Sequence, residues 1–356
     1  MLGKKRQIFS KINEDIILIH QDSMASMNFN TCNSYILRLR DNEFAIIDPG
    51  SSLKKLNKTL TQNNIDFENI KHAYLTHGHS DHVNMLDYLQ EKNPEMISYI
   101  HPLERSYVEN AVEYYELLFP LRMIENQEKF SDFITAIKFY THPNSNLTLN
   151  QNFKMVFDTW NVKSRKVDKT IKHGDVLPGG LKVIHAPGHT PGMCMLYKEQ
   201  DKILFSSDIH LSKAGATVNG DKCSVSEYKK SIKKVMEMVE EGVVEMLLTG
   251  HGKNPINSNL RERLQQFYDT ITKKEVLILT ILQKKEKMTI EDITNATFAE
   301  YIKRFEKFTH LDMFRDTICI AEASEMMGNY NFLIELERLN KVRKEVSEDK
   351  TFWMLV

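Results

Sequence analysis

The sequence has few of the features that mark specialised classes of protein. Only four of its 356 residues are cysteines, and no two of them form a Cys-x-x-Cys pair, so we expect buried thiols rather than disulfide bonds. Charge of one sign is also missing, because 47 lysines and arginines nearly balance 48 aspartates and glutamates. The resulting net charge of −1 provides no overall field that would attract nucleic acid or a membrane surface.

Long hydrophobic runs are absent as well. No apolar stretch approaches the roughly 20 residues that span a bilayer, and the basic start of the chain is not followed by the apolar core of a signal peptide. We therefore expect a cytoplasmic protein that has no membrane partner. What remains is an ordinary globular composition, with 41% hydrophobic and 27% charged residues, which argues against wholesale disorder.

The hydrophobic pattern divides the chain into two predicted domains, residues 1–258 and 259–356. In the first, short aliphatic runs alternate with helical patterns, which is typical of an α/β domain. Residues 103–172 interrupt this alternation, and their apolar residues at helical spacing predict a mostly helical insertion. In residues 259–356 the pattern predicts helices followed by a strand, a turn and a second strand. This order is the outline of a winged-helix-like domain. The helical ranges are 260–282, 289–294, 313–327 and 331–339.

A dense cluster of metal-ligand side chains follows a predicted buried strand at residues 72–76. Its six residues hold three imidazoles and one carboxylate, with a glycine and a small serine that let the backbone bend: His77-Gly78-His79-Ser80-Asp81-His82. Four further candidates each come after another strand-like run: Asp48, His189, Asp208 and His251. Zinc accepts histidine nitrogen and aspartate oxygen, and catalytic zinc sites leave one position open for water. We therefore predict a metal centre where these strands end.

Taken in order, these segments resemble the five motifs of the metallo-β-lactamase superfamily, over about residues 14–255 without the insertion. The resemblance implies an αββα sandwich with two divalent metals at one edge. It implies that His77, His79 and His189 hold one metal and that Asp81, His82 and His251 hold the other. Asp208 would bridge the two, and Asp48 would accept a hydrogen bond from a ligand imidazole and so fix its tautomer. We expect zinc, although iron or manganese would also fit this ligand set.

The chemistry implied by this resemblance is hydrolysis. Two metals held close together lower the pKa of a shared water, so that hydroxide is available near neutral pH to attack a carbonyl carbon or a phosphorus. The metals would also polarise the substrate oxygen and stabilise the charge that develops on it. Asp81 is a candidate to orient the hydroxide as well as to bind metal. His210, two residues after Asp208, either faces the substrate or packs, and we include it as a candidate catalytic residue.

The motifs do not identify the bond that is broken. The loop from Ala186 to Gly192 resembles that of the glyoxalase II-like group, whose members hydrolyse thioesters, lactones and other acyl esters, so we favour a small-molecule acyl substrate. The C-terminal part resembles the winged helix of lactamase-like proteins that include a single-strand ribonuclease. Endonuclease cleavage of single-stranded RNA is therefore the alternative, although acidic residues are mixed with the basic ones of the wing. A non-catalytic metal-binding regulator is a third option, and the aromatic insertion is compatible with a homodimer.

Overall fold

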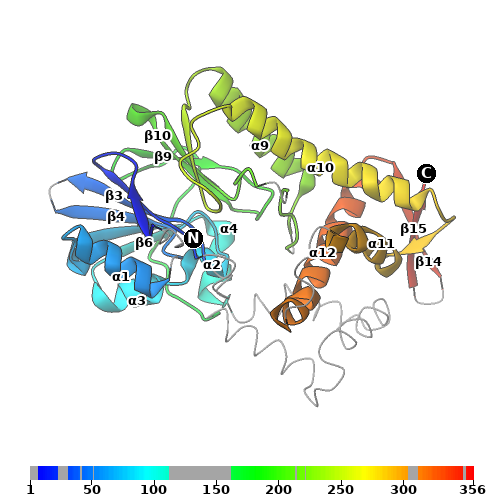
Figure 1. Cartoon of the computed structure of the whole chain (residues 1–356), viewed down its shortest axis with the longest axis horizontal. Coiled ribbons are helices and arrows are strands. Elements are labelled where there is room, and N and C mark those ends of the chain that lie inside the picture. The colour runs from blue at the N-terminus through cyan, green and yellow to red at the C-terminus, as the bar shows by residue number, and fades with distance from the viewer. Residues whose placement is uncertain are drawn as a thin grey trace, which may run out of the picture.

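Two β-sheets packed face to face form the centre of the molecule (Figure 1). The computed structural model describes residues 7–22, 31–40, 42–50, 52–111, 162–212, 215–220, 222–303, 312–347 and 350–356, with all of their side chains except those of 300–303 and 312–323. The first sheet has the strand order β1-β2-β3-β4-β5-β6-β7. Its strands are β1 (Phe9–Lys11), β2 (Ile16–Ile19), β3 (Ser34–Arg40), β4 (Glu43–Ile47), β5 (Ile70–Tyr74), β6 (Ile97–Ile100) and β7 (Lys169–Thr170).

The second sheet has the order β12-β11-β10-β9-β8. Its strands are β8 (Val176–Leu177), β9 (Leu181–His185), β10 (Cys194–Lys198), β11 (Ile203–Ser207) and β12 (Met246–Thr249). Strands β9 and β11 run in the same direction, because each is antiparallel to β10, and β12 is parallel to β11. The carboxyl ends of these three strands therefore meet at one edge of the sheet.

The alternation of side chains along the strands builds the layers. In β2, Ile16 and Leu18 enter the core between the sheets, whereas Ile17 and Ile19 pack against helices on the other face. Those helices are α1 (Leu53–Gln62) and α3 (Leu86–Lys92). Helices α9 (Val225–Glu240) and α10 (Leu260–Leu282) cover the outer face of the second sheet. The predicted αββα sandwich is confirmed.

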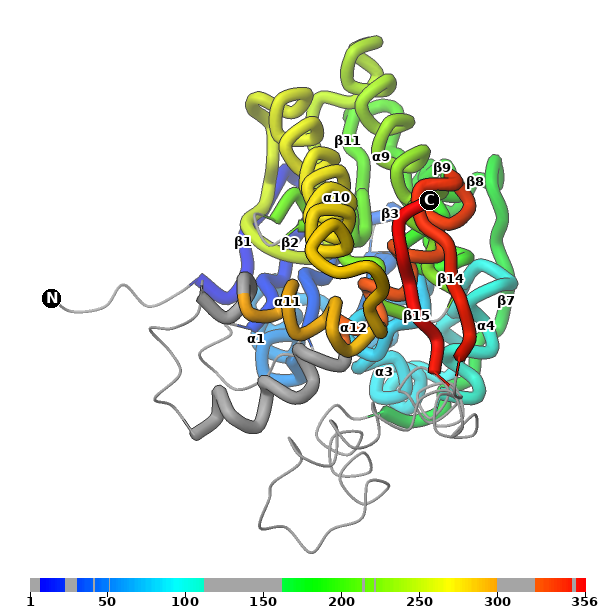
Figure 2. The backbone as a smooth tube through the Cα atoms, turned by 90° about the vertical axis from the view of Figure 1, so that its right-hand side faces the viewer, coloured from blue at the N-terminus to red at the C-terminus, as the bar shows by residue number. Residues whose placement is uncertain are grey.

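The long helix α10 continues from the sandwich into the C-terminal elements, as both views show (Figure 2). These elements are β13 (Met288–Thr289), α11 (Ile290–Lys303), α12 (Asp312–Arg338), β14 (Val342–Ser347) and β15 (Lys350–Leu355). The three strands pair in the order β13-β15-β14. The assignment of this region to the winged-helix class, and its boundary at residue 259, stay predictions. One apolar core joins it to the second sheet, since Leu333 and Phe267 belong to the same cluster as Leu204.

Two helices differ from the sequence prediction. The predicted helices at 313–327 and 331–339 are one continuous helix, α12, and the short helix at 289–294 extends to Lys303 as α11. The predicted gap, residues 328–330, contains Asn329, and Asn331 follows it; asparagine usually favours turns. In the fold both side chains find partners outside their own helix, so the helix continues through them.

The remaining elements are short. Helix α2 (Ser80–Val83) lies within the predicted metal-ligand cluster, and α4 (Pro102–Glu109) begins the predicted insertion, of which residues 112–161 lie outside the described part of the chain. Short 3-10 turns occupy Phe67–Asn69 and Glu199–Asp201. Cys32, Cys194 and Cys223 form no disulfide bond, and the side chain of Cys319 is outside the description. Within the described residues, no helix has the length and apolar character needed to cross a membrane.

Candidate metal centre

The candidate ligands converge because each one follows a strand that ends at the same edge of the sandwich. Asp48 comes directly after β4, the histidine cluster starts three residues after β5, Asp208 comes directly after β11 and His251 follows β12. A hydroxyl contact joins the two sheets just before the ligands, since Ser207 Oγ donates to Thr76 Oγ1 at 2.8 Å. The directions of the strands and this contact thus form the edge without any contribution from the candidate ligand side chains.

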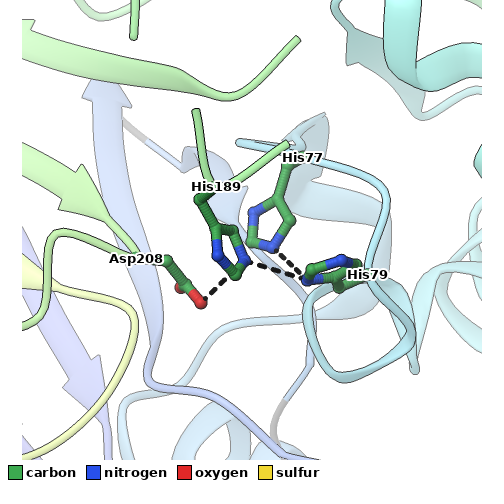
Figure 3. A group of neighbouring side chains, drawn as sticks. All are labelled: His77, His79, His189 and Asp208. Atoms are coloured by element: carbon green, nitrogen blue, oxygen red, sulfur yellow. Dashed lines mark hydrogen bonds and ion pairs between the residues drawn. The ribbon is translucent and has the colours of Figure 1, made fainter. Parts of the chain in front are cut away.

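The first group of candidate ligands consists of His77, His79, His189 and Asp208, whose ligand atoms all lie within 4.8 Å of one another (Figure 3). His79 Nδ1 is 3.0 Å from His77 Nε2 and also 3.0 Å from His189 Nε2. Asp208 Oδ2 is 3.1 Å from His189 Nε2. Four candidate metal-binding atoms, which come from three loops, therefore face one point.

The hydrogen bond on the far side of His189 fixes which nitrogen faces this point. Its Nδ1 donates to the carbonyl oxygen of Thr217 at 2.8 Å, so the Nε2 of the neutral ring carries a lone pair. That lone pair points at His79 Nδ1, which is also approached by His77 Nε2. A single ring proton cannot satisfy both neighbours, whereas one cation between the three nitrogens satisfies all of them.

The second group consists of Asp81, His82 and His251. His82 Nε2 lies 3.3 Å from His251 Nε2, and His251 Nε2 lies 3.2 Å from Asp81 Oδ2. The outer nitrogens are again occupied, because His82 Nδ1 contacts Asp48 Oδ2 at 2.9 Å and His251 Nδ1 contacts Gln21 Oε1 at 3.0 Å. Both Nε2 atoms are thereby directed inward, toward the carboxylate of Asp81.

Asp208 lies between the two groups. Its Oδ2 faces His189, while its Oδ1 is 3.1 Å from His82 Nε2 and 3.6 Å from His251 Nε2. This Oδ1 is buried and accepts no hydrogen bond. A buried carboxylate oxygen without a donor costs free energy unless a cation compensates it, so the residues present fit a pair of divalent metals on either side of Asp208. Gly250 makes room, since a Cβ there would lie 2.8 Å from the same oxygen.

Asp48 holds the second group from outside. Its left-handed backbone (φ 49°) turns the chain at the end of β4, and its carboxylate accepts the N–H and the hydroxyl of Thr76, both at 2.7 Å. The same carboxylate contacts His82. The structure thus brings Asp48 to the imidazole of a candidate ligand, and its role in fixing the tautomer remains a proposal.

Burial and charge set the protonation of these groups for metal binding. Burial lowers the pKa of His77 well below its ordinary value and the pKa of His79 to about 3, so both imidazoles are neutral. Burial alone would lower the pKa of His251, but the carboxylates of Asp208 and Asp81 outweigh it and raise that pKa. The second group is therefore a negative environment that favours a positive charge, whether a proton or a metal.

His210 lies beside the second group rather than in it. Its ring is 5.9 Å from the ring of His251 and 5.2 Å from that of Phe267 in α10. Its Nδ1 accepts the backbone N–H of Ser212 at 3.1 Å, and burial lowers its pKa to about 4. The side chain both packs against the C-terminal region and borders the candidate ligands.

Sequence reasoning missed Glu104, which is fully buried in α4. Its Oε2 accepts the backbone N–H of Gly78 at 2.9 Å and its Oε1 accepts that of Gly192 at 2.6 Å. Gly78 lies between two candidate ligands and Gly192 three residues after a third, so one carboxylate connects two ligand loops. Burial raises the pKa of Glu104 to about 7, although the N–H donors act in the opposite direction. The close approach explains both glycines, because a Cβ on either would clash with α4.

Comparison with known proteins identifies a family and related folds. The model of the metallo-beta-lactamase superfamily matches residues 27–251. A beta-lactamase domain protein from Burkholderia ambifaria has a solved structure that covers 100% of this chain and 97% of its own, with a TM-score of 0.68 and 16% identity. A metallo-beta-lactamase family protein from Thermus thermophilus covers 91% and 94%, with a TM-score of 0.63 and 16% identity. At these identities the two structures show the fold alone.

Matches to curated sequences have higher sequence identity but cover fewer residues. An uncharacterized protein of Aquifex aeolicus is 26% identical over 215 residues, which are 60% of this chain and 80% of that protein. The acyl-coenzyme A thioesterase MBLAC2 of Gallus gallus is 38% identical over 87 residues, which are 23% of this chain and 31% of that enzyme. The match thus spans less than a third of the thioesterase.

The contacts of Glu104 predict that Glu104→Gln weakens metal binding. Glutamine offers one acceptor oxygen, so one of the two N–H groups would face an amide NH₂, and the two ligand loops would lose their common anchor. We expect the zinc affinity to fall by about 10-fold, as for outer partners of metal ligands. The measurement is competition with a chromogenic chelator.

Glu109→Gln is the matched control for this variant. It lies on the same helix and also accepts a backbone N–H, that of Val167, but away from the ligand loops. Equal zinc affinity in the two variants would show that Glu104 does not support the site.

Proposed function

The chain belongs to the metallo-beta-lactamase superfamily, and on this premise we propose that it is a hydrolase of thioesters or related acyl esters that works with a pair of divalent metals. The observation that carries the proposal is the position of Asp208, whose two oxygens face two separate groups of histidines. We infer that His77, His79 and His189 would hold one metal and that Asp81, His82 and His251 would hold the other, with Asp208 shared between the two groups. Metals bound there would supply an activated water and a Lewis acid for the substrate oxygen.

The exposure of the ligands indicates the side from which substrate approaches. His77 and His82 are fully buried, whereas the side chains of Asp81 and His251 keep 21% and 26% of their surface exposed. The side chain of His79 is also only partly buried, so we infer that substrate and water reach the site from the side of Asp81, His251 and His79. Asp81 is the carboxylate on that side, and we assign it the task of orienting the attacking water and accepting its proton.

His210 is placed to assist on the same side, next to His251. Because its Nδ1 accepts a hydrogen bond from Ser212, the proton of the neutral ring lies on Nε2. We assign this N–H the task of donating a hydrogen bond to the oxygen or sulfur of the substrate as negative charge develops there. Its packing against Phe267 would hold the ring in place.

Two observations favour an acyl substrate over RNA. The name of one relative, an acyl-coenzyme A thioesterase, supports thioester chemistry. In addition, lysines around the wing strands β14 and β15 are paired with carboxylates, Lys344 with Glu337 at 3.2 Å and Lys287 with Glu345 at 3.3 Å. The phosphate groups of RNA would have to compete with these carboxylates for the lysines, so this surface is poorly suited to binding RNA.

The substrate class is tested by offering several esters side by side. With zinc-loaded protein we expect turnover of acyl-coenzyme A or glutathione thioesters that stops with EDTA and returns with zinc. Lactones, bis-p-nitrophenyl phosphate and single-stranded RNA are the comparison substrates. EDTA-sensitive RNA cleavage without acyl hydrolysis would reverse the proposal, and a metal-loaded protein that hydrolyses none of the substrates would favour a regulator.

The assigned roles predict different behaviour for two variants. Asp208→Ala should lose bound metal and lower kcat by about 10³-fold or more, because it removes the bridging carboxylate. His210→Gln should keep its metal and lower kcat by about 10²-fold, the usual contribution of one hydrogen bond to developing negative charge. His173→Ala, an exposed histidine outside the site, is the control. Full turnover in Asp208→Ala, or an unchanged kcat in His210→Gln, would contradict the corresponding role.

A further inference from the structure

The segment that connects Asp208 to α9 lies between the candidate metal site and the C-terminal helices. The described residues between Asp208 and α9 are 209–212, 215–220 and 222–224, and the last two ranges are here called the connecting segment. Contacts on one side of this connecting segment reach His189, and contacts on its other side reach α10 and α12. No feature of the sequence predicted that the C-terminal region would approach a metal ligand in this way.

On the inner side, the connecting segment holds His189 by its ring and by its backbone. The carbonyl oxygen of Thr217 accepts the Nδ1 proton of the ring at 2.8 Å. Cys223 Sγ donates to the carbonyl oxygen of His189 at 2.8 Å, and the N–H of Ser224 donates to that of Gly188 at 2.9 Å. The direction of His189 Nε2 toward His79 therefore depends on where this segment lies.

On the outer side, α12 holds the same segment. The side-chain amide of Asn331 uses both of its protons, one on the carbonyl oxygen of Val218 at 2.7 Å and one on that of Gly220 at 3.0 Å. The amide of Asn219 donates to Ser324 Oγ at 2.7 Å. Helix α12 comes close at Gly328, where a Cβ would lie 2.7 Å from Asn219 Oδ1.

Helix α10 adds a contact to the start of the segment. The N–H of Ala216 donates to Thr270 Oγ1 at 3.2 Å, and Val218 is fully buried in the core that α10 and α12 share with the second sheet. Residues 216, 218, 219 and 220 are thus attached to C-terminal helices, and Thr217, in the middle of them, is attached to His189. A chain fixed on both sides of Thr217 leaves its carbonyl oxygen little freedom.

We propose that the C-terminal helices are part of the metal site, and that Asn331 is a positioning residue which orients His189 through the connecting segment. The proposal rests on the metal site of the proposed function but not on its substrate. It gives the C-terminal region a role that requires neither nucleic acid nor a second subunit. The proposal also agrees with the shared apolar core, through which α10 and α12 pack against the second sheet.

The test compares two asparagines that lie two residues apart on α12. Asn331→Asp puts a carboxylate against two carbonyl oxygens and Asn331→Ala removes both donors, so in each the segment around Thr217 should move. Asn329→Ala is the matched control, because Asn329 donates only to Thr294 and Thr297 of α11 and should affect stability alone. All variants are made in the full chain, and their folding is checked by thermal unfolding of the metal-free protein.

Zinc affinity, measured by chelator competition, is the main readout. We expect the Asn331 variants to bind the first zinc about 10-fold more weakly, at the lower end of the range for residues that hydrogen-bond to a metal ligand, because Asn331 acts on His189 only through Thr217. Absorption of the cobalt(II)-loaded protein should change as well, since it reports ligand geometry. Asn329→Ala should lower the melting temperature without changing either the zinc affinity or the cobalt spectrum.

The outcomes separate this proposal from the proposed function. Wild-type protein that binds no zinc or cobalt would remove the metal site itself. Wild-type protein that binds metal, with Asn331 variants that bind it equally well, would overturn the positioning role alone. If the Asn331 variants fail to fold, Asn219→Ala cuts the contact with Ser324 from the segment side, and a wild-type zinc affinity there would equally overturn the proposal.

Discussion

The rest of the structure depends on one constraint, the convergence of seven polar side chains at a mostly buried edge. Five imidazoles and two carboxylates lie there in two groups, each group with its ligand atoms within 4.8 Å. Lone pairs that face one another away from water are costly unless a positive charge lies between them. We infer that two divalent cations meet this cost, because a single ring proton cannot serve both neighbours of His79, and Asp208 Oδ1 has no donor.

The surroundings of the two groups hold the ligands so that few can turn away. Asp48 and Gln21 occupy the outer nitrogens of His82 and His251, and the carbonyl of Thr217 occupies that of His189. Glu104 then joins two ligand loops to α4, and α12 fixes the segment that carries Thr217. Such prearrangement reduces the reorganisation needed on metal binding and keeps the site ready for hydrolysis. The C-terminal helices belong to this supporting layer.

Much of the sandwich, and the convergence of the candidate ligands at one edge, could be predicted from the sequence, because both follow local rules. Strands such as residues 16–19 can be recognised by their run of aliphatic residues. A histidine or aspartate directly after a strand lies at its carboxyl end. The supporting residues could not be found this way. Glu104 contacts Gly78 from 26 residues away, and Asn331 contacts Val218 from 113 residues away. Thr217 acts through its carbonyl oxygen, which any residue would supply. The gap predicted within α12 is absent from the fold, where Asn329 and Asn331 find distant partners.

The most direct test of the central claim is a crystal structure of the zinc-loaded protein with anomalous diffraction recorded at the zinc edge. We predict two anomalous peaks, one among His77, His79 and His189 and one among Asp81, His82 and His251, with Asp208 between them. Data that show no peak at these residues, or a single peak that leaves one group without metal at saturating zinc, would contradict the two-metal site and the proposed hydrolase with it.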